Sequence, residues 1–275
     1  MGEWFRTAPI WLLGLLLFVA TVGCALAGAR VNRWYTQRNR EQERLSESQA
    51  GHVVSMIYAL LSLLIGFTFQ MAAERFEVRR QLVREDAIAI ETLYLKAQLL
   101  ADPYRSTLSG LLVRYAENHL ALAQVRREDS DARRLMADDD QLRRELWTAL
   151  IPAFDSIKDL DFSTSLVESS TEVVRVDTAR RAARGSPIPT TIILGLIFYS
   201  LVAAAGLGAI MKSRKGEIAS AFLLGLSALA LMLISDLNRP VDGTIHESQE
   251  PMRQMLVRLQ NNPPTVFQPI AAQPH

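Results

Sequence analysis

Side chains that commonly do chemistry are few in this sequence, and their spacing is not that of a catalytic site. There is one cysteine, Cys24, which excludes an intrachain disulfide and a cysteine-based zinc cluster. No glycine-rich phosphate loop or nucleophile elbow is present. We therefore predict that the protein is not an enzyme and has no cofactor or metal ion. The four histidines, none of which has zinc-ligand spacing, are His52, His119, His246 and His275.

Three other features invite a functional interpretation, and each has a simpler structural one. The triplet Asp138–Asp140 could hold a divalent cation, but carboxylates are favoured at the start of a helix, and we expect a helix to begin there. The basic run Arg180–Arg184 could bind anionic lipid headgroups. Basic residues beside a membrane span are also common for reasons of orientation, and we favour that interpretation. His119 lies on an apolar helix face, so we predict a packed core residue.

The elements that must position these residues are mostly helices. Four windows contain no formal charge, and each has about the 17–25 residues needed to cross a bilayer. Backbone amides at that depth find no water, so each window must be helical. The first window is too long for a secretory signal, and we expect it to be retained. The windows are Ile10–Ala29, Val53–Ala73, Pro189–Met211 and Ile218–Ser235.

The stretch between the second and third windows is charged and has helical periodicity. Apolar residues recur at three- and four-residue steps from Phe76 to Leu100, and Asp102-Pro103 should end that helix. A second helix follows, a third should open at Asp138, and a fourth should run to Arg184. The sequence thus predicts an all-α integral membrane protein with four transmembrane helices and a helical soluble domain. The predicted segments are 1–73 (first hairpin), 74–187 (soluble domain), 188–236 (second hairpin) and 237–275 (C-terminal tail).

Three stretches at the margins of the spans resemble one family. They are LLIGFTFQMAAERFEVRRQLVREDAIAIETLYLKAQLL (Leu63–Leu100), ARRAARGSPIPTTI (Ala179–Ile192) and DLNRPVDGTIHESQEPM (Asp236–Met252). Together they are similar to the bestrophin-like group of four-span bacterial membrane proteins, DUF4239. The group resembles in turn, more distantly, the bestrophin channels. The resemblance covers the spans and their borders.

The more distant resemblance implies a function and a site. Bestrophins have a Gly-Phe pair followed by an Arg-aromatic pair in their second helix, matched here by Gly66-Phe67 and Arg75-Phe76. That helix lines the pore of a homopentamer, where three apolar residues one turn apart form a hydrophobic neck. By position these are Ala59, Leu63 and Phe67, and Ala59 is smaller than the bulky residue of the family. The acidic calcium-binding cluster of animal bestrophins has no counterpart after the fourth span.

The resemblance implies a homo-oligomeric ion channel in a bacterial inner membrane, with membrane lipid and ions as partners and no nucleic acid. The alternative is a non-conducting membrane scaffold or sensor whose helical domain binds a partner. Counts of Lys and Arg do not decide the orientation; the resemblance places both termini and the soluble domain in the cytoplasm. Ionisable groups at the membrane border are costly and often functional. Those groups are Glu74, Arg75, Asp236 and Arg239, and we expect Asp236 and Arg239 to lie near Arg75.

Overall fold

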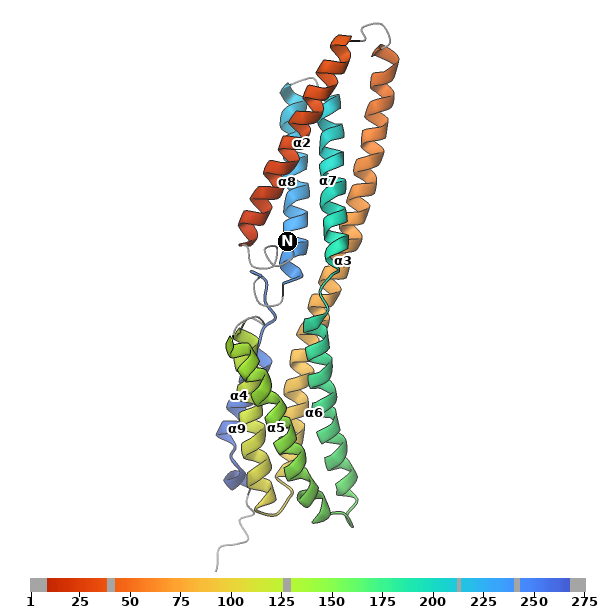
Figure 1. Cartoon of the computed structure of the whole chain (residues 1–275). Coiled ribbons are helices and arrows are strands. Elements are labelled where there is room, and N and C mark those ends of the chain that lie inside the picture. Colours follow the sequence, from red (N-terminus) through yellow and green to blue (C-terminus); the bar gives the residue numbers. More distant parts are fainter. Residues whose placement is uncertain (1–8, 39–42, 126–129, 212–213, 240–242, 268–275) are drawn as a thin grey trace, which may run out of the picture. The chain divides into compact units, whose positions relative to one another are not determined.

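A computed structural model of the chain describes residues 9–38, 43–125, 130–211, 214–239 and 243–267. These residues form helices and loops, with no strand in the described ranges (Figure 1). Four helices are long and apolar enough to cross a membrane, and they cover the four predicted windows except for Met211 at the end of the third. The all-α prediction is therefore confirmed. In chain order the helices are α2 (Ile10–Arg38), α3 (Glu43–Ala97), α4 (Tyr104–Gln124), α5 (Ser130–Asp155), α6 (Phe162–Gly185), α7 (Thr190–Ile210), α8 (Arg214–Leu237), α9 (Glu250–Asn261) and the 3₁₀ turn η1 (Pro264–Phe267).

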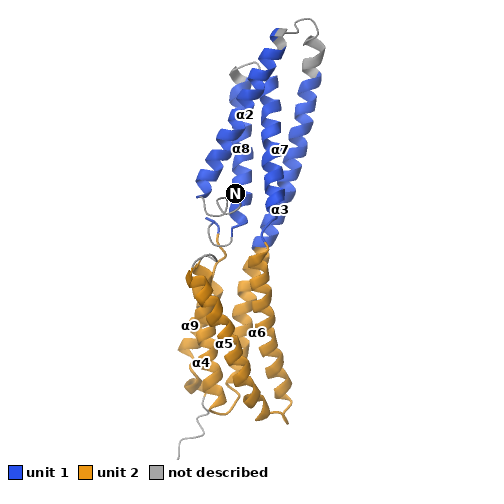
Figure 2. Ribbon diagram, viewed as in Figure 1, with its two compact units in different colours: residues 1–76, 187–245 blue, residues 77–186, 246–275 orange. Residues whose placement is uncertain are grey.

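The chain divides into two compact units (Figure 2). Unit 1 contains residues 1–76 and 187–245, and therefore all four apolar windows. Unit 2 contains residues 77–186 and 246–275. Each unit is thus assembled from two separate stretches of chain.

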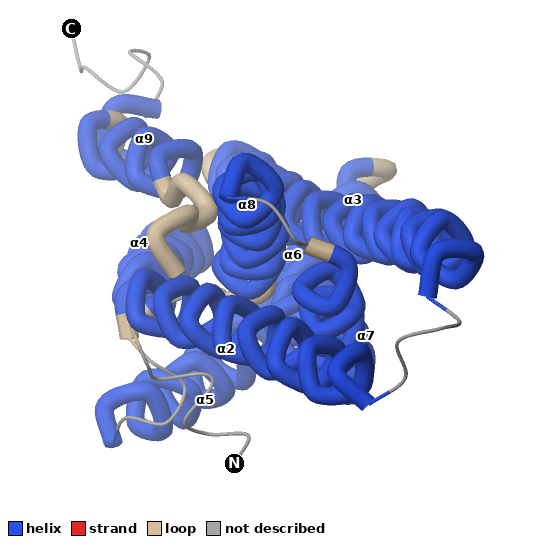
Figure 3. Tube along the Cα trace, turned by 90° about the horizontal axis from the view of Figure 1, so that it is seen from above, coloured by secondary structure: helices blue, strands red, loops and turns tan. Residues whose placement is uncertain are grey.

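Unit 1 is a bundle in which small residues let helix backbones approach closely. Helix α2 packs against α7 and α8 (Figure 3). A side chain added at Gly28 would clash with the backbone of Ala205, and one at Gly208 would clash with that of Ala25. Asn32 adds a hydrogen bond from its Nδ2 to the carbonyl oxygen of Ala209 at 2.7 Å. Packing of this kind is how membrane helices associate where apolar burial gives no net driving force.

Helix α3 belongs to both units and is the longest helix among the described residues. Its 55 residues contain no proline, so nothing removes a hydrogen bond from its ladder. Its first half carries the apolar window, and beyond Glu74 its composition becomes that of a helix in water. One continuous helix therefore passes from a membrane environment into an aqueous one.

Unit 2 has a single apolar core contributed by α3, α4, α5, α6 and α9. The predicted break at Asp102-Pro103 is confirmed, since α3 ends at Ala97 and α4 begins at Tyr104. The prediction that a helix opens at Asp138 is wrong, because α5 begins at Ser130 and the acidic triplet lies inside it. The amphipathic helix α9 was not predicted, although it places Met252, Met255 and Leu259 in the core.

Candidate functional site

The three predicted neck residues lie on a face of α3 that the described part of the chain leaves exposed. Leu61 is 2% exposed and packs with α7 and α8, whereas Leu63 is 52% exposed and Phe67 is 64% exposed. With about 3.6 residues per turn, Leu63 lies roughly opposite Leu61 on the helix. Ala59 is exposed on the same side. The structure thus presents Ala59, Leu63 and Phe67 outward, toward whatever surrounds unit 1.

The border charges at the end of α8 are engaged within unit 1. Asp236 is buried and accepts a hydrogen bond from the backbone N–H of Thr244 at 2.6 Å and a second from the Thr244 hydroxyl. An added side chain at Gly243 would approach the Asp236 carboxylate to 2.7 Å. Asp236 therefore fixes the chain that leaves the last membrane helix. Arg239 is also buried, Arg75 is half-buried and Glu74 is exposed; contact of Arg75 with Asp236 stays a prediction.

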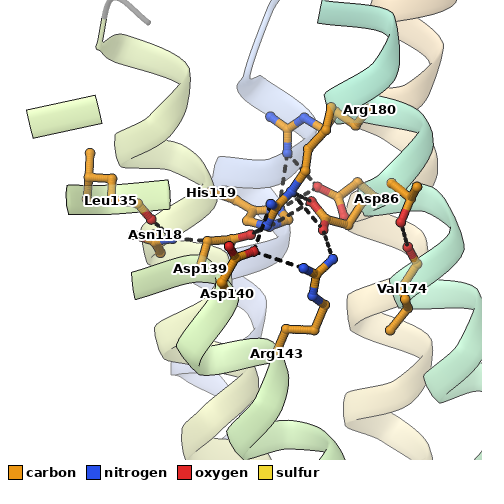
Figure 4. Close-up of polar contacts among 12 residues, drawn as sticks. Asp86, Asn118, His119, Leu135, Asp139, Asp140, Arg143, Val174 and Arg180 are labelled. Carbon is orange, nitrogen blue, oxygen red and sulfur yellow. Dashed lines mark hydrogen bonds and ion pairs between the residues drawn. The ribbon is translucent and has the colours of Figure 1, made fainter. Parts of the chain in front are cut away.

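A second concentration of functional groups, which we call the charge cluster, lies inside unit 2. His119 of α4 stands at its centre, with its side chain 3% exposed. Its Nδ1 is 2.7 Å from Oδ2 of Asp86 on α3. On the other side, its Nε2 is 3.0 Å from Oδ1 of Asp139 on α5 and 3.7 Å from Oδ1 of Asp177 on α6. One imidazole thus meets carboxylates from three neighbouring helices (Figure 4).

Arginines from α6 surround these carboxylates. Arg180, 6% exposed, pairs with Asp86 and donates to Gln249 at 2.9 Å. Arg181 pairs with Asp139 and lies 3.1 Å from Asp177. The prediction that the basic run only orients a membrane span is therefore wrong for these two residues. Their guanidinium groups bind carboxylates of unit 2 because a buried charge needs a partner of opposite sign.

The rim of the cluster is more accessible to solvent. Arg143 of α5 donates to Asp140 at 2.8 Å and to Asp177 at 3.3 Å. Arg181 also donates to Asp140 at 2.9 Å. Both arginine side chains are about one-third exposed, at 32% and 37%. Asp139 and Asp140 of the predicted capping triplet thus bind groups on other helices, and they do not cap α5.

Burial and neighbouring charge act differently on the carboxyl groups of the cluster, which lie outside the apolar windows. Burial alone would raise the pKa of Asp86, but His119 and Arg180 hold that pKa below its usual range. For Asp177 burial dominates, and with the negative charge of Asp86 it raises the pKa. The Tyr115 ring lies 4.2 Å from that of His119. Burial, then the charges of Asp177 and Asp86, raise the pKa of the Tyr115 hydroxyl.

Most of this cluster was not predicted, although the sequence contains a signal for it. His119 was predicted as a packed core residue, and it is buried, but it is also bonded to carboxylates. Asp86 falls within the apolar stripe of α3, between Val83 and Ile90. Asp177 similarly follows the buried Val176 on α6. An acidic residue at a core position of several helices is the pattern that indicates a shared buried site.

The sequence matches a family model named bestrophin-like domain over residues 19–252. No curated protein matches it. Among solved structures, a tryptophan-to-alanine variant of a bacterial bestrophin homologue from Klebsiella pneumoniae is similar, with a TM-score of 0.65 and 16% identity. The match covers 94% of this chain and 98% of the other. A proline-to-alanine variant of a membrane protein gives a TM-score of 0.64 and 17% identity, over 93% and 99% of the two chains.

A structure of the Klebsiella homologue phased with zinc gives a TM-score of 0.60 at 17% identity, over 94% of this chain and 99% of the other. At such identities these likenesses concern the fold alone. The family model, in contrast, spans most of the sequence, from within α2 to the first turn of α9. The protein is a membrane protein with apolar spanning helices, and the chain belongs to the bestrophin-like family.

Proposed function

We propose that the chain is one subunit of a homo-oligomeric ion channel, a pentamer by resemblance, whose pore is lined by α3. The observation that carries this proposal is the outward face of α3. Leu63 and Phe67 are one turn apart, apolar and exposed, on the side of the helix opposite to its packing face. Around a symmetry axis such residues would form rings, and apolar constrictions can gate by dewetting. Ala59 would form a third and wider ring.

The continuity of α3 supports the same proposal. A pore helix that extends into water without a break can carry an ion path out of the membrane. In this proposal the segment 74–187 and both termini are cytoplasmic, and the membrane is a bacterial inner membrane. Single-cysteine variants Ser130→Cys and Ser213→Cys, each with Cys24→Ser, test the orientation. If an impermeant reagent added from outside labels position 130 but not position 213, the orientation is the reverse of the proposed one.

A second function is favoured by the surface of unit 2. Trp147, Ile151 and Phe154 follow one another at helical spacing on α5 and are 46%, 62% and 37% exposed. An apolar stripe on a helix in water suits a partner protein. A non-conducting scaffold or sensor would use this stripe for a different protein, whereas a channel subunit would use it for its neighbours. The mass of the purified protein in nanodiscs separates the two, because a monomer or dimer has no central pore.

The decisive experiment is ion flux through liposomes that contain the purified oligomer. We expect wild-type protein to conduct and Phe67→Ala to conduct more or to lose its gating, because the constriction then wets more easily. Phe198→Ala is the matched control. Phe198 is 69% exposed, nearly the same as Phe67, but lies on α7. Intact oligomers whose flux is unchanged by Phe67→Ala, or changed equally by Phe198→Ala, would contradict the neck.

A further inference from the structure

The charge cluster of unit 2 contains the donor set of a metal centre. Suitable donor atoms of His119, Asp139 and Asp177 all lie within 4.8 Å of one another. Each residue comes from a different helix, and each is buried. In a zinc site, metal–nitrogen and metal–oxygen bonds of about 2.0–2.2 Å place neighbouring ligand atoms roughly 3.3 Å apart. The distances from Nε2 of His119 to Oδ1 of Asp139 and to Oδ1 of Asp177 are 3.0 and 3.7 Å, on either side of that value.

The buried charges call for a positive charge beside Nε2 of His119. Among the side chains that are at most 6% exposed, Asp86, Asp139 and Asp177 are opposed by Arg180 alone. The partly exposed rim formed by Arg143, Arg181 and Asp140 adds one net positive charge, and the positive charge of Arg184 also acts on Asp86. A lone pair on Nε2 would face two carboxylate oxygens. A proton or a metal ion must therefore lie between them.

The geometry favours a metal ion over a proton. A proton on Nε2 can bond to Asp139 at 3.0 Å, but the 3.7 Å to Asp177, which also accepts from Arg143 and Arg181, is too long for a hydrogen bond. A metal ion engages both carboxylates at once. On the other side of the ring, Nδ1 lies 2.7 Å from Oδ2 of Asp86 and 3.2 Å from Nη1 of Arg180. The shorter contact assigns the Nδ1 proton to Asp86, which is the partner that a metal-bound histidine needs. A carboxylate on the second nitrogen fixes the tautomer and turns the lone pair of the first toward the metal.

Three buried polar atoms of the cluster have no hydrogen-bond partner among the described residues: Nε of Arg180, Oδ1 of Asp86 and the hydroxyl of Tyr115. Asp86 and Tyr115 are both 0% exposed. The Asp86 carboxylate contacts His119 through its other oxygen, and the Tyr115 ring packs on the His119 ring. Three protein ligands leave at least one coordination position for water. Asp86 contacts the ring on its Nδ1 side, so a metal-bound water at Nε2 would supply a partner for the Tyr115 hydroxyl, on which the charge of Asp177 acts.

We propose that unit 2 binds one divalent transition-metal ion of the zinc class through His119 Nε2, Asp139 and Asp177, with Asp86 orienting the imidazole. Imidazole and carboxylate donors together suit zinc and its neighbours better than magnesium or calcium. The ion joins α4, α5 and α6, and Asp86 links it to α3. The site is independent of whether the protein conducts ions.

The test uses the full-length protein in detergent, stripped with a chelator and then titrated with Zn²⁺ and Co²⁺. We expect one ion retained per chain by elemental analysis, a visible Co²⁺ spectrum, and a raised thermal midpoint that the chelator reverses. His119→Gln should abolish all three. His246→Gln is the matched control, because His246 is exposed and outside the donor set. Its metal binding should equal that of the wild type.

Asp86→Asn keeps all three ligands and should weaken metal affinity by about 10–100-fold, the usual effect of removing an orienting carboxylate. Metal retention by the wild type and its Co²⁺ spectrum decide the matter even if either variant does not fold. Wild-type protein that retains no metal, and whose thermal midpoint responds to pH but not to any of the ions, would show a proton at Nε2 and overturn the proposal. Equal affinities of wild type and Asp86→Asn would overturn the role of Asp86.

Discussion

Removing Arg180 should destabilise unit 2 far more than removing another arginine of the same helix. In Arg180→Met the carboxylate of Asp86, which is 0% exposed, loses the cation that pairs with it. Truncating one partner of a buried ion pair typically costs 3–5 kcal/mol, because the remaining charge is buried without compensation. His119 still contacts Asp86, so we expect about 3 kcal/mol, near the lower end of that range.

Arg175→Met is the matched control. Arg175 lies five residues earlier on α6 and binds Glu172 through two hydrogen bonds of 2.7 Å. Its side chain is 59% exposed and that of Glu172 is 47% exposed. Exposed pairs contribute about 0–1 kcal/mol because solvent screens them. Two arginines with good carboxylate geometry on one helix should therefore differ by at least about 2 kcal/mol.

Thermal unfolding of the full-length protein in detergent, followed by tryptophan fluorescence, measures the difference, since Trp147 reports from unit 2. The double variant Asp86→Asn, Arg180→Met should recover part of the loss, because it leaves no uncompensated charge. Equal midpoints for Arg180→Met and Arg175→Met would refute the buried pair. A double variant whose loss equals or exceeds the sum of the two single losses would refute the coupling.

Three further changes have defined outcomes. Leu61→Ala should lower the free energy of unfolding by about 2–5 kcal/mol, and Leu63→Ala by less than half as much, because the two leucines are 2% and 52% exposed in the subunit. Thermal unfolding measures both losses. Similar losses for the two variants would place Leu63 in an interface. Gly28→Val should prevent a stable fold by size-exclusion chromatography, whereas Gly195→Ala, which meets nothing within 4 Å, should be tolerated. The pKa of Asp86 is lower in the folded state than in the unfolded state. Its contribution to stability is therefore complete above the unfolded pKa of about 4 and is lost as the pH falls below that value. The unfolding midpoint should depend less on pH in Asp86→Asn than in the wild type.

The membrane helices could be predicted because lipid imposes a strong and local rule. A window such as Val53–Ala73 has no charge over the length of a bilayer, and nothing in the rest of the fold can change that requirement. The break at Pro103 has an equally local cause. The close contacts at Gly28 and Gly208 follow from a packing rule for small residues that is also legible in the sequence.

The charge cluster could not be predicted in the same way, because its meaning depends on contacts between distant segments. Asp86 and Arg180 are separated by 94 residues, and the sequence around either residue does not indicate which residue it pairs with. The acidic triplet was misassigned because carboxylates suit a helix start equally well. Whether a carboxylate caps a helix or belongs to a buried ion pair is decided only by how α3, α4, α5 and α6 pack against one another. Helix α9 was missed because it is short, with only 12 residues.

The discontinuity of unit 2 has a consequence for biosynthesis. Its core remains incomplete until Met252, Met255 and Leu259 of α9 have been translated, after both membrane hairpins. The ion pairs Arg79–Glu247 and Arg258–Glu91 then join the late segment to α3. A ribosome that stops after α8 therefore releases a chain with four spans and an open soluble core. Exposed apolar surface of that kind is what chaperones and proteases recognise. Folding of unit 2 therefore depends on translation of the chain beyond both membrane hairpins, as far as α9.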